Sequence, residues 1–152
     1  MERRVLIIRG LGAALVVLLS AVALAFALVR PDPSADLCFK EAGEAAIAAC
    51  TRAIQSGRFG GARLATIYDN RAMELRQQGD YDRAIADYSE AIRIDADLTG
   101  AYAGRGLAYE AKVDVEKATA DYRKALSDAA KYEDGQWAHD TARERLAALG
   151  AK

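Results

Sequence analysis

The chain has 152 residues, enough for one domain or for one domain with a targeting segment. Apolar residues make up 52% and charged residues 28%, so the composition is neither disordered nor collagen-like. The net charge of −1 argues against nucleic-acid binding, because nucleic-acid-binding proteins normally carry a basic surface. With 1 histidine and 2 cysteines, few side chains could bind zinc, and we expect neither a metal nor a cofactor.

The N-terminal segment, residues 1–30, is predicted to be a signal peptide or a single-pass membrane anchor. Residues 11–29 are 19 consecutive uncharged positions, and three arginines precede them. As a helix they would reach roughly 28 Å, close to the thickness of a bilayer core. An Ala-Phe-Ala sequence ending at Ala27 matches a cleavage site, but the long apolar run favours an uncleaved anchor. Both alternatives place the remainder across the membrane, because the arginines stay in the cytoplasm.

A short linker, residues 31–36, is expected to separate this segment from the rest of the chain. Pro31 and Pro33 disfavour a helix and make the linker stiff and extended. From Pro31 onward the chain has 17 basic and 21 acidic residues, so the exported part is mildly acidic. We interpret residues 37–152 as one unit.

That unit contains an internal repeat: residues 65–98 and 99–132 align without a gap, at an offset of 34 residues. Nine aligned positions are identical. In each segment apolar residues recur at helical spacing, and in the first one the sequence Gln78-Gly79-Asp80 is typical of a turn between two helices. No stretch shows the alternation of a half-buried strand. The sequence therefore predicts an all-α fold of antiparallel helix-turn-helix repeats.

The recurring residues resemble the tetratricopeptide repeat family, which has the same 34-residue period. The matching positions are aromatic, small and large in the first helix, and alanine, aromatic and alanine in the second. They are Tyr68, Ala72, Leu75, Ala84, Tyr88 and Ala91, and then Tyr102, Gly106, Tyr109, Ala118, Tyr122 and Ala125. The chain departs from the family pattern where the family has leucine (Arg71, Arg105) and where it has proline (Ala96, Ala130).

Two repeats are too few for a stable array, so the flanking segments are expected to complete it. Residues 37–58 are predicted to be a truncated repeat, followed by a glycine-rich loop at Ser56–Ala62. Residues 136–149 are predicted to be a capping helix. Its packed side is expected to carry Trp137, Thr141, Ala142 and Leu146.

Cys38 and Cys50 are predicted to form a disulfide bond, because the domain is expected to be exported to an oxidising compartment. The bond would pin the truncated repeat. A redox-active pair is the alternative, but such pairs usually have the spacing C-x-x-C.

An arginine and an aspartate recur 16 residues apart, as Arg71 with Asp87 and as Arg105 with Asp121. Because both copies keep both members, we expect structural ion pairs. The pairs would join the two helices of a repeat, or Asp87 and Arg105 of adjacent repeats. A row of arginines that binds a ligand is the alternative.

The resemblance implies a concave groove, lined by the first helix of each repeat, that binds a peptide or a partner protein. The residues expected there are Thr66, Asp69, Met73 and Arg76, and then Gly100, Ala103, Leu107 and Glu110. Family members that clamp a peptide carboxylate use lysine and asparagine at such positions, so this type is not expected here. Alternatively, Met73 and Leu107 pack against a neighbouring helix or against the lengthened Gly57–Gly61 loop.

Together these features predict a non-catalytic interaction scaffold of the bacterial cell envelope, anchored in the inner membrane or secreted to the periplasm. Its partner would be an unidentified protein or peptide, with the membrane as a second contact if residues 1–30 are retained. One alternative is an envelope enzyme acting on cell-wall or β-lactam substrates, although the sequence offers no nucleophile–base arrangement. The other is a purely structural subunit of an envelope complex.

Overall fold

The computed structural model describes residues 32–127, 132 and 135–151. These residues form helices and no strand, which confirms the all-α prediction. The helices are α2 (Ser34–Lys40), α3 (Gly43–Gln55), α4 (Gly61–Gln77), α5 (Tyr81–Ile94), α6 (Thr99–Ala111), α7 (Val115–Ser127) and α8 (Gly135–Ala148).

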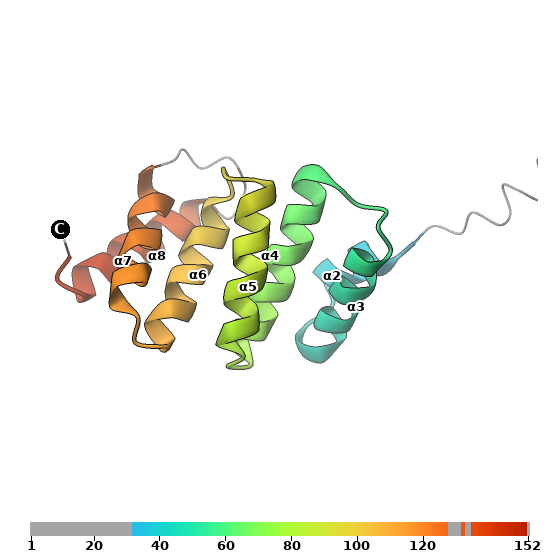
Figure 1. Ribbon diagram of the computed structural model, residues 1–152, viewed down its shortest axis with the longest axis horizontal. Coiled ribbons are helices and arrows are strands. Elements are labelled where there is room, and N and C mark those ends of the chain that lie inside the picture. The colour runs from blue at the N-terminus through green and yellow to red at the C-terminus, as the bar shows by residue number, and fades with distance from the viewer. Residues whose placement is uncertain (1–31, 128–131, 133–134, 152) are drawn as a thin grey trace, which may run out of the picture. The chain divides into compact units, whose positions relative to one another are not determined.

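Consecutive helices pack as helix-turn-helix pairs: α2 with α3, α4 with α5, and α6 with α7 (Figure 1). Each pair also contacts the next one, through α3 against α4 and α5 against α6. The last helix, α8, packs against both α6 and α7. The array therefore buries its apolar faces between neighbours, as a repeat protein must.

Small residues let the helices approach closely around two buried tyrosines. A Cβ atom added to Gly104 would lie 2.5 Å from the ring of Tyr88, and one added to Gly106 would lie 2.6 Å from the ring of Tyr122. Both distances are shorter than a van der Waals contact, so each tyrosine fills the space that a side chain would need. The remaining buried positions of these repeats are mostly alanines.

The turn inside each repeat follows the predicted chemistry in one copy and departs from it in the other. Gly79 ends α4 with a φ of +82°, and the next residue, Asp80, caps α5 by accepting a hydrogen bond from the Arg83 amide. At the equivalent position after α6, Val113 has a φ of +63°. A β-branched residue is strained in this left-handed region, where glycine is favoured.

Two helices begin earlier than the repeat alignment predicts. The first, α2, begins at Ser34, inside the predicted linker, because the carbonyl of Pro33 accepts the first helical hydrogen bond, from Leu37. Proline is tolerated at a helix start, where its missing N–H has no partner to lose. The second, α4, begins at Gly61, so the glycine-rich loop is shorter than Ser56–Ala62.

The prediction for the packed side of α8 is wrong for Trp137, which is 46% exposed. The buried residues of this helix include Ala138, Ala142 and Leu146, each four positions apart. Trp137 precedes this stripe by one position, a rotation of about 100° around the helix axis. Alanines at the stripe allow α8 to pack closely on α6 and α7, which a tryptophan ring would prevent.

The predicted signal peptide or membrane anchor, residues 1–30, lies outside the described residues. Among the helices described, none has the length and apolar character needed to cross a bilayer.

Candidate binding groove

A cavity of about 670 Å³ opens on the side of the array formed by the first helices of the repeats. Its lining comes from every helix pair and from α8: Phe39, Thr66, Asp69, Asn70, Met73, Tyr88, Leu98, Gly100, Tyr132 and Trp137. Phe39, Met73 and Trp137 are large apolar residues that remain 41%, 36% and 46% exposed. Exposed apolar side chains around a cavity are typical of a binding surface.

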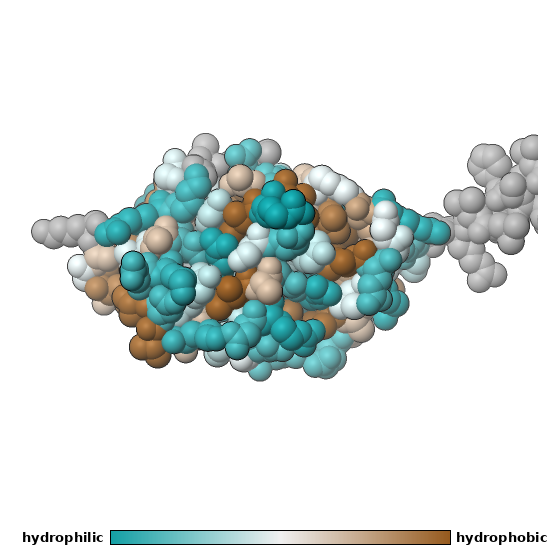
Figure 2. All heavy atoms as spheres, in the orientation of Figure 1, coloured by the Kyte–Doolittle hydropathy of each residue, from teal (hydrophilic) through white to brown (hydrophobic). Residues whose placement is uncertain are grey.

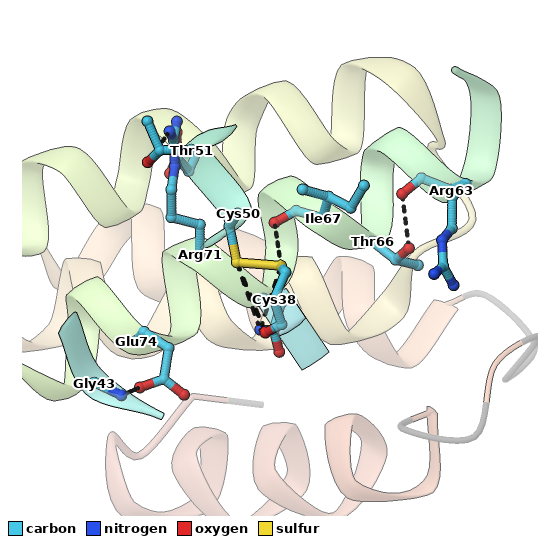
Figure 3. The surroundings of a disulfide bond; sticks show 11 residues. Cys38, Gly43, Cys50, Thr51, Arg63, Thr66, Ile67, Arg71 and Glu74 are labelled. Atoms are coloured by element: carbon cyan, nitrogen blue, oxygen red, sulfur yellow. Dashed lines mark hydrogen bonds and ion pairs between the residues drawn. A yellow bond between two sulfur atoms is a disulfide. The ribbon is translucent and has the colours of Figure 1, made fainter. Parts of the chain in front are cut away.

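The wall formed by α2 depends on the disulfide. Cys38 in α2 and Cys50 in α3 are bonded to each other, and both are fully buried (Figure 3). Asn70 of α4 donates a hydrogen bond to the carbonyl oxygen of Cys38 and also lines the cavity. Phe39, the next residue, therefore stands on a helix that is attached to α3 covalently and to α4 by hydrogen bonding.

One face of the Phe39 ring is covered by an arginine. The guanidinium carbon of Arg63 lies 4.8 Å from the ring centroid, and the same side chain forms an ion pair of 3.2 Å with Asp36. This arrangement orients the ring from α4, although both charged groups are largely solvent-exposed and add little stability.

The structure brings half of the predicted groove residues together. Thr66, Asp69 and Met73 of α4 line the cavity, as does Gly100 of α6. Arg76, Ala103, Leu107 and Glu110 are not part of the lining. Arg76 lies close enough to Tyr88 to counter part of the rise in the pKa of its phenol.

The other predicted positions on α6 are covered by α8. Ala103 is fully buried, and Leu107 packs against the core cluster that includes Ala142 and Leu146. The Glu110 carboxylate accepts hydrogen bonds from the Tyr122 hydroxyl, at 2.8 Å, and from Arg145 of α8. This bond to Arg145 lowers the pKa of Glu110, so the carboxylate is charged at neutral pH.

Two of the described lining residues, Asp69 and Tyr88, interact electrostatically. Burial raises the pKa of the Tyr88 phenol, and the negative charge of Asp69 raises it further. The phenol therefore keeps its proton at any physiological pH and is available as a donor. Asp69 itself is half-buried on the middle turns of α4.

The two arginine–aspartate pairs lie away from the cavity and join the helices. Arg71 makes a bidentate pair with Asp87, with distances of 2.7 and 2.8 Å, and Arg105 makes the same pair with Asp121, at 2.8 and 2.8 Å. Each arginine also donates to a hydroxyl of the preceding helix pair: Arg71 to Thr51 and Arg105 to Ser89. The pairs connect the two helices within a repeat, and Asp87 does not pair with Arg105.

Comparisons with known proteins agree with this architecture. A model of the TPR repeat matches residues 73–113. Among solved structures, the TPR domain of Arabidopsis OM64 is 30% identical, with a TM-score of 0.53 over 66% of this chain and 80% of that domain. The chain belongs to the tetratricopeptide repeat family. A search of curated proteins gives no significant match.

Tetratricopeptide repeats are protein-interaction scaffolds, and this tetratricopeptide protein carries such a scaffold. Family members of this type are generally non-catalytic. Among the described residues, no group of three or more histidine, cysteine, aspartate or glutamate side chains is placed to hold a metal ion.

Sequence reasoning missed several cavity residues of this tetratricopeptide protein, namely Phe39, Asn70, Tyr88, Leu98, Tyr132 and Trp137. For Phe39 a signal existed: it adjoins Cys38, and a short helix pinned by a disulfide presents its neighbours in fixed directions. For Trp137 the signal was ambiguous, because a tryptophan next to an alanine stripe fits the core as well as the surface.

Proposed function

We propose that the protein is a non-catalytic scaffold of the bacterial cell envelope that holds a segment of a partner protein in its groove. The observation that carries the proposal is the cavity of about 670 Å³, whose wall keeps three large apolar side chains in solvent. Because Phe39, Met73 and Trp137 are 36–46% exposed, each forgoes roughly 0.5–1.5 kcal/mol of further burial, which a bound segment would recover in part.

The size of the cavity suits a short segment rather than a whole domain. It lies within the range of about 300–1,000 Å³ that is typical of small-ligand and peptide sites. Because the positions on α6 toward its C-terminal end are covered by α8, the partner would contact α2, α4 and the beginning of α6. A few central side chains would then carry most of the affinity.

An envelope location is supported by the disulfide and by the N-terminal sequence. Structural disulfides persist in oxidising compartments such as the periplasm and are rare in the cytosol. The apolar run at 11–29, with arginines before it, supplies an export signal or an anchor. Intact mass of the native protein distinguishes the two: residues 1–30 are retained in an anchor, whereas a mature N-terminus near Leu28 identifies a secreted protein.

The groove is tested by site-specific photo-crosslinking in the native envelope. A photoreactive residue at Met73 is compared with one at Val115, which is also an exposed apolar position (42% against 36%) and does not line the cavity. In Figure 2, apolar residues are visible near the N-terminal end of α7. Val113 and Val115, in the turn before α7 and at its first position, are exposed. We expect a discrete crosslinked partner from position 73 and none from position 115.

A partner captured equally from both positions would contradict binding in the groove, and capture from position 115 alone would place the interaction on the turn. Met73→Asp and Val115→Asp give the matched loss-of-function test. Met73→Asp should abolish partner capture with an unchanged melting temperature, whereas Val115→Asp should leave capture intact.

A further inference from the structure

The turn between α6 and α7 combines two unfavourable features at one residue. Val113 has a φ of +63°, in the left-handed region where a β-branched side chain is strained. The same residue is 82% exposed, more than any other large hydrophobic residue that the structure describes. Because so little of it is buried, packing within the domain does not offset the strain. A strained and exposed apolar residue points to a contact outside the domain.

The corresponding turn of the preceding repeat shows that the fold does not require this residue. The equivalent position, 34 residues earlier, is Gly79, which adopts a φ of +82° without strain. Two residues later, Tyr81 is half-buried, whereas its counterpart Val115 is 42% exposed. The second repeat therefore carries an apolar tip, formed by Val113 and Val115, that the first repeat lacks.

The backbone of this valine tip is already hydrogen-bonded within the chain. The amides of Lys112, Val113 and Asp114 donate to carbonyl oxygens of α6 over 2.8 to 3.2 Å. The Asp114 carboxylate in turn accepts a hydrogen bond from the amide of Lys117, in the first turn of α7. An amide without a partner is costly in an apolar phase. The valine tip can thus meet such a phase with the amides around Val113 already paired.

The size of the valine tip indicates the class of partner that it suits. Specific protein interfaces bury about 800 Å² on each partner, and valine is under-represented among the residues that dominate their affinity. At exposures of 82% and 42%, burial of both valines favours a contact by only about thirtyfold. Even micromolar binding of a soluble protein needs about a millionfold. The contact is strong enough only to orient a domain that is already held beside an apolar phase.

The anchored form proposed above provides such a phase. In that form residues 11–29 are held in a bilayer, and four residues, 30–33, connect them to α2. The domain then stays near lipid, where a tethered contact forms at a high effective concentration. Of the four charged side chains between positions 112 and 117, two are basic and two are acidic, so their charges cancel.

We infer that Val113 and Val115 form an apolar tip that contacts the bilayer surface and orients the anchored domain on it. The ligand is the boundary between lipid headgroups and acyl chains, which accepts apolar side chains at shallow depth. The inference rests on the anchored form of the proposed function, and it is independent of what the groove binds.

The test uses the full chain in phosphatidylcholine nanodiscs, in which part of the lipid carries a nitroxide quencher on the acyl chain close to the headgroup. A fluorophore is attached through Ala111→Cys, beside the valine tip, or through Gln55→Cys, at an exposed polar residue that ends α3. Cys38 and Cys50 are bonded to each other and fully buried, so the introduced cysteine is the one that reacts.

Quenching is compared between the chain with both valines, Val113→Gly, and Val113→Gly/Val115→Ser. We expect the fluorophore at 111 to be quenched at least about threefold more than the one at 55. Val113→Gly should lower the ratio of docked to free domain about tenfold, although relief of the positive φ raises the melting temperature. A loss of contact in a more stable variant is not caused by unfolding. The double variant should reduce quenching at 111 to the level at 55.

Two outcomes would overturn the inference and leave binding in the groove standing. One is equal quenching at 111 and 55 in a chain that stays with the nanodiscs. The other is quenching at 111 that persists in the double variant, because another group would then make the contact. Quenching that requires an added anionic lipid, phosphatidylglycerol, would also overturn it, since the charges at the valine tip cancel.

Two further measurements separate this inference from the proposed function. A full chain that does not float with lipid would overturn the anchored form, and the inference with it, whereas crosslinking from position 73 tests the groove independently. Capture of a protein, including a second copy of this chain, by a photoreactive residue at position 115 would overturn the inference, because a protein would then cover the valine tip.

Discussion

Removing the disulfide should loosen the beginning of the array without unfolding its end. The bond joins residues separated by 12 positions. In the loop-entropy treatment, a cross-link of this length stabilises the fold by about 3 kcal/mol. For a unit the size of residues 33–152, this corresponds to a decrease in melting temperature of about 11 °C.

The loss should be concentrated in α2. This helix has 7 residues, far fewer than the roughly 12–15 needed for even marginal stability in isolation. Without the bond it keeps the packing of Ala35 and the hydrogen bond from Asn70 to the Cys38 carbonyl. We therefore expect the amides of α2 to exchange faster, while those of α6 and α7 keep their protection.

The assay compares oxidised wild-type protein, reduced wild-type protein and a Cys38→Ala/Cys50→Ala variant by thermal melting and hydrogen exchange. The reduced protein measures the effect of the S–S bond alone, because both cysteine side chains stay in the core. A decrease of less than about 3 °C on reduction, with α2 still protected, would refute the reasoning that the bond holds α2 in place.

Three further predictions concern packing, backbone strain and pH. Gly106→Ala should destabilise the fold by about 1–3 kcal/mol in urea unfolding, and by more than Gly104→Ala. The methyl added at Gly106 meets the ring carbons of Tyr122, whereas the one added at Gly104 meets the hydroxyl end of Tyr88; an equal loss would contradict this packing. Val113→Gly should raise the stability by about 1 kcal/mol by relieving a positive φ, and a lower urea midpoint would show that no strain exists there. Because Arg145 lowers the pKa of Glu110, the charged pair stabilises the fold above the unfolded value of 4.5 and loses this effect as the pH falls through the lowered pKa. Glu110→Gln should therefore flatten the decrease in melting temperature below pH 4.5, and an unchanged slope would contradict the pairing.

The repeats could be predicted because their determinants are local. Helical spacing, the Gly79 turn and the Asp80 cap all act within a few residues, and the 34-residue offset superimposes one copy on the next. The arginine–aspartate pairs followed from the same logic, since two side chains that recur together at one spacing tend to meet. What the alignment did not reveal was the hydroxyl that each arginine also reaches in the preceding helix pair.

The groove was harder to predict because its extent depends on how α8 is rotated. The prediction placed Trp137 on the packed side of α8. It also placed Leu107 of α6 in the groove, at the position equivalent to Met73 of α4. In the structure the packed side of α8 differs by one residue, so Leu107 packs against the cluster that includes Ala142 and Leu146. Arg145 binds Glu110, and Trp137 lines the cavity. A shift of about 100° around one helix thus moves the cavity toward α2.

This rotation also explains why the truncated first repeat matters for recognition. With the far part of α6 covered, the apolar wall has to be completed at the other end, and the residue that completes it is Phe39. Phe39 stands on a helix too short to be stable alone, so the wall depends on Cys38, Cys50 and the Asn70 hydrogen bond behind it. The disulfide that the sequence suggested as a stabilising element is therefore also a positioning element of the groove. Reduction should weaken capture of the partner from position 73 of the folded protein. Capture unchanged by reduction would show that binding does not depend on the position of Phe39.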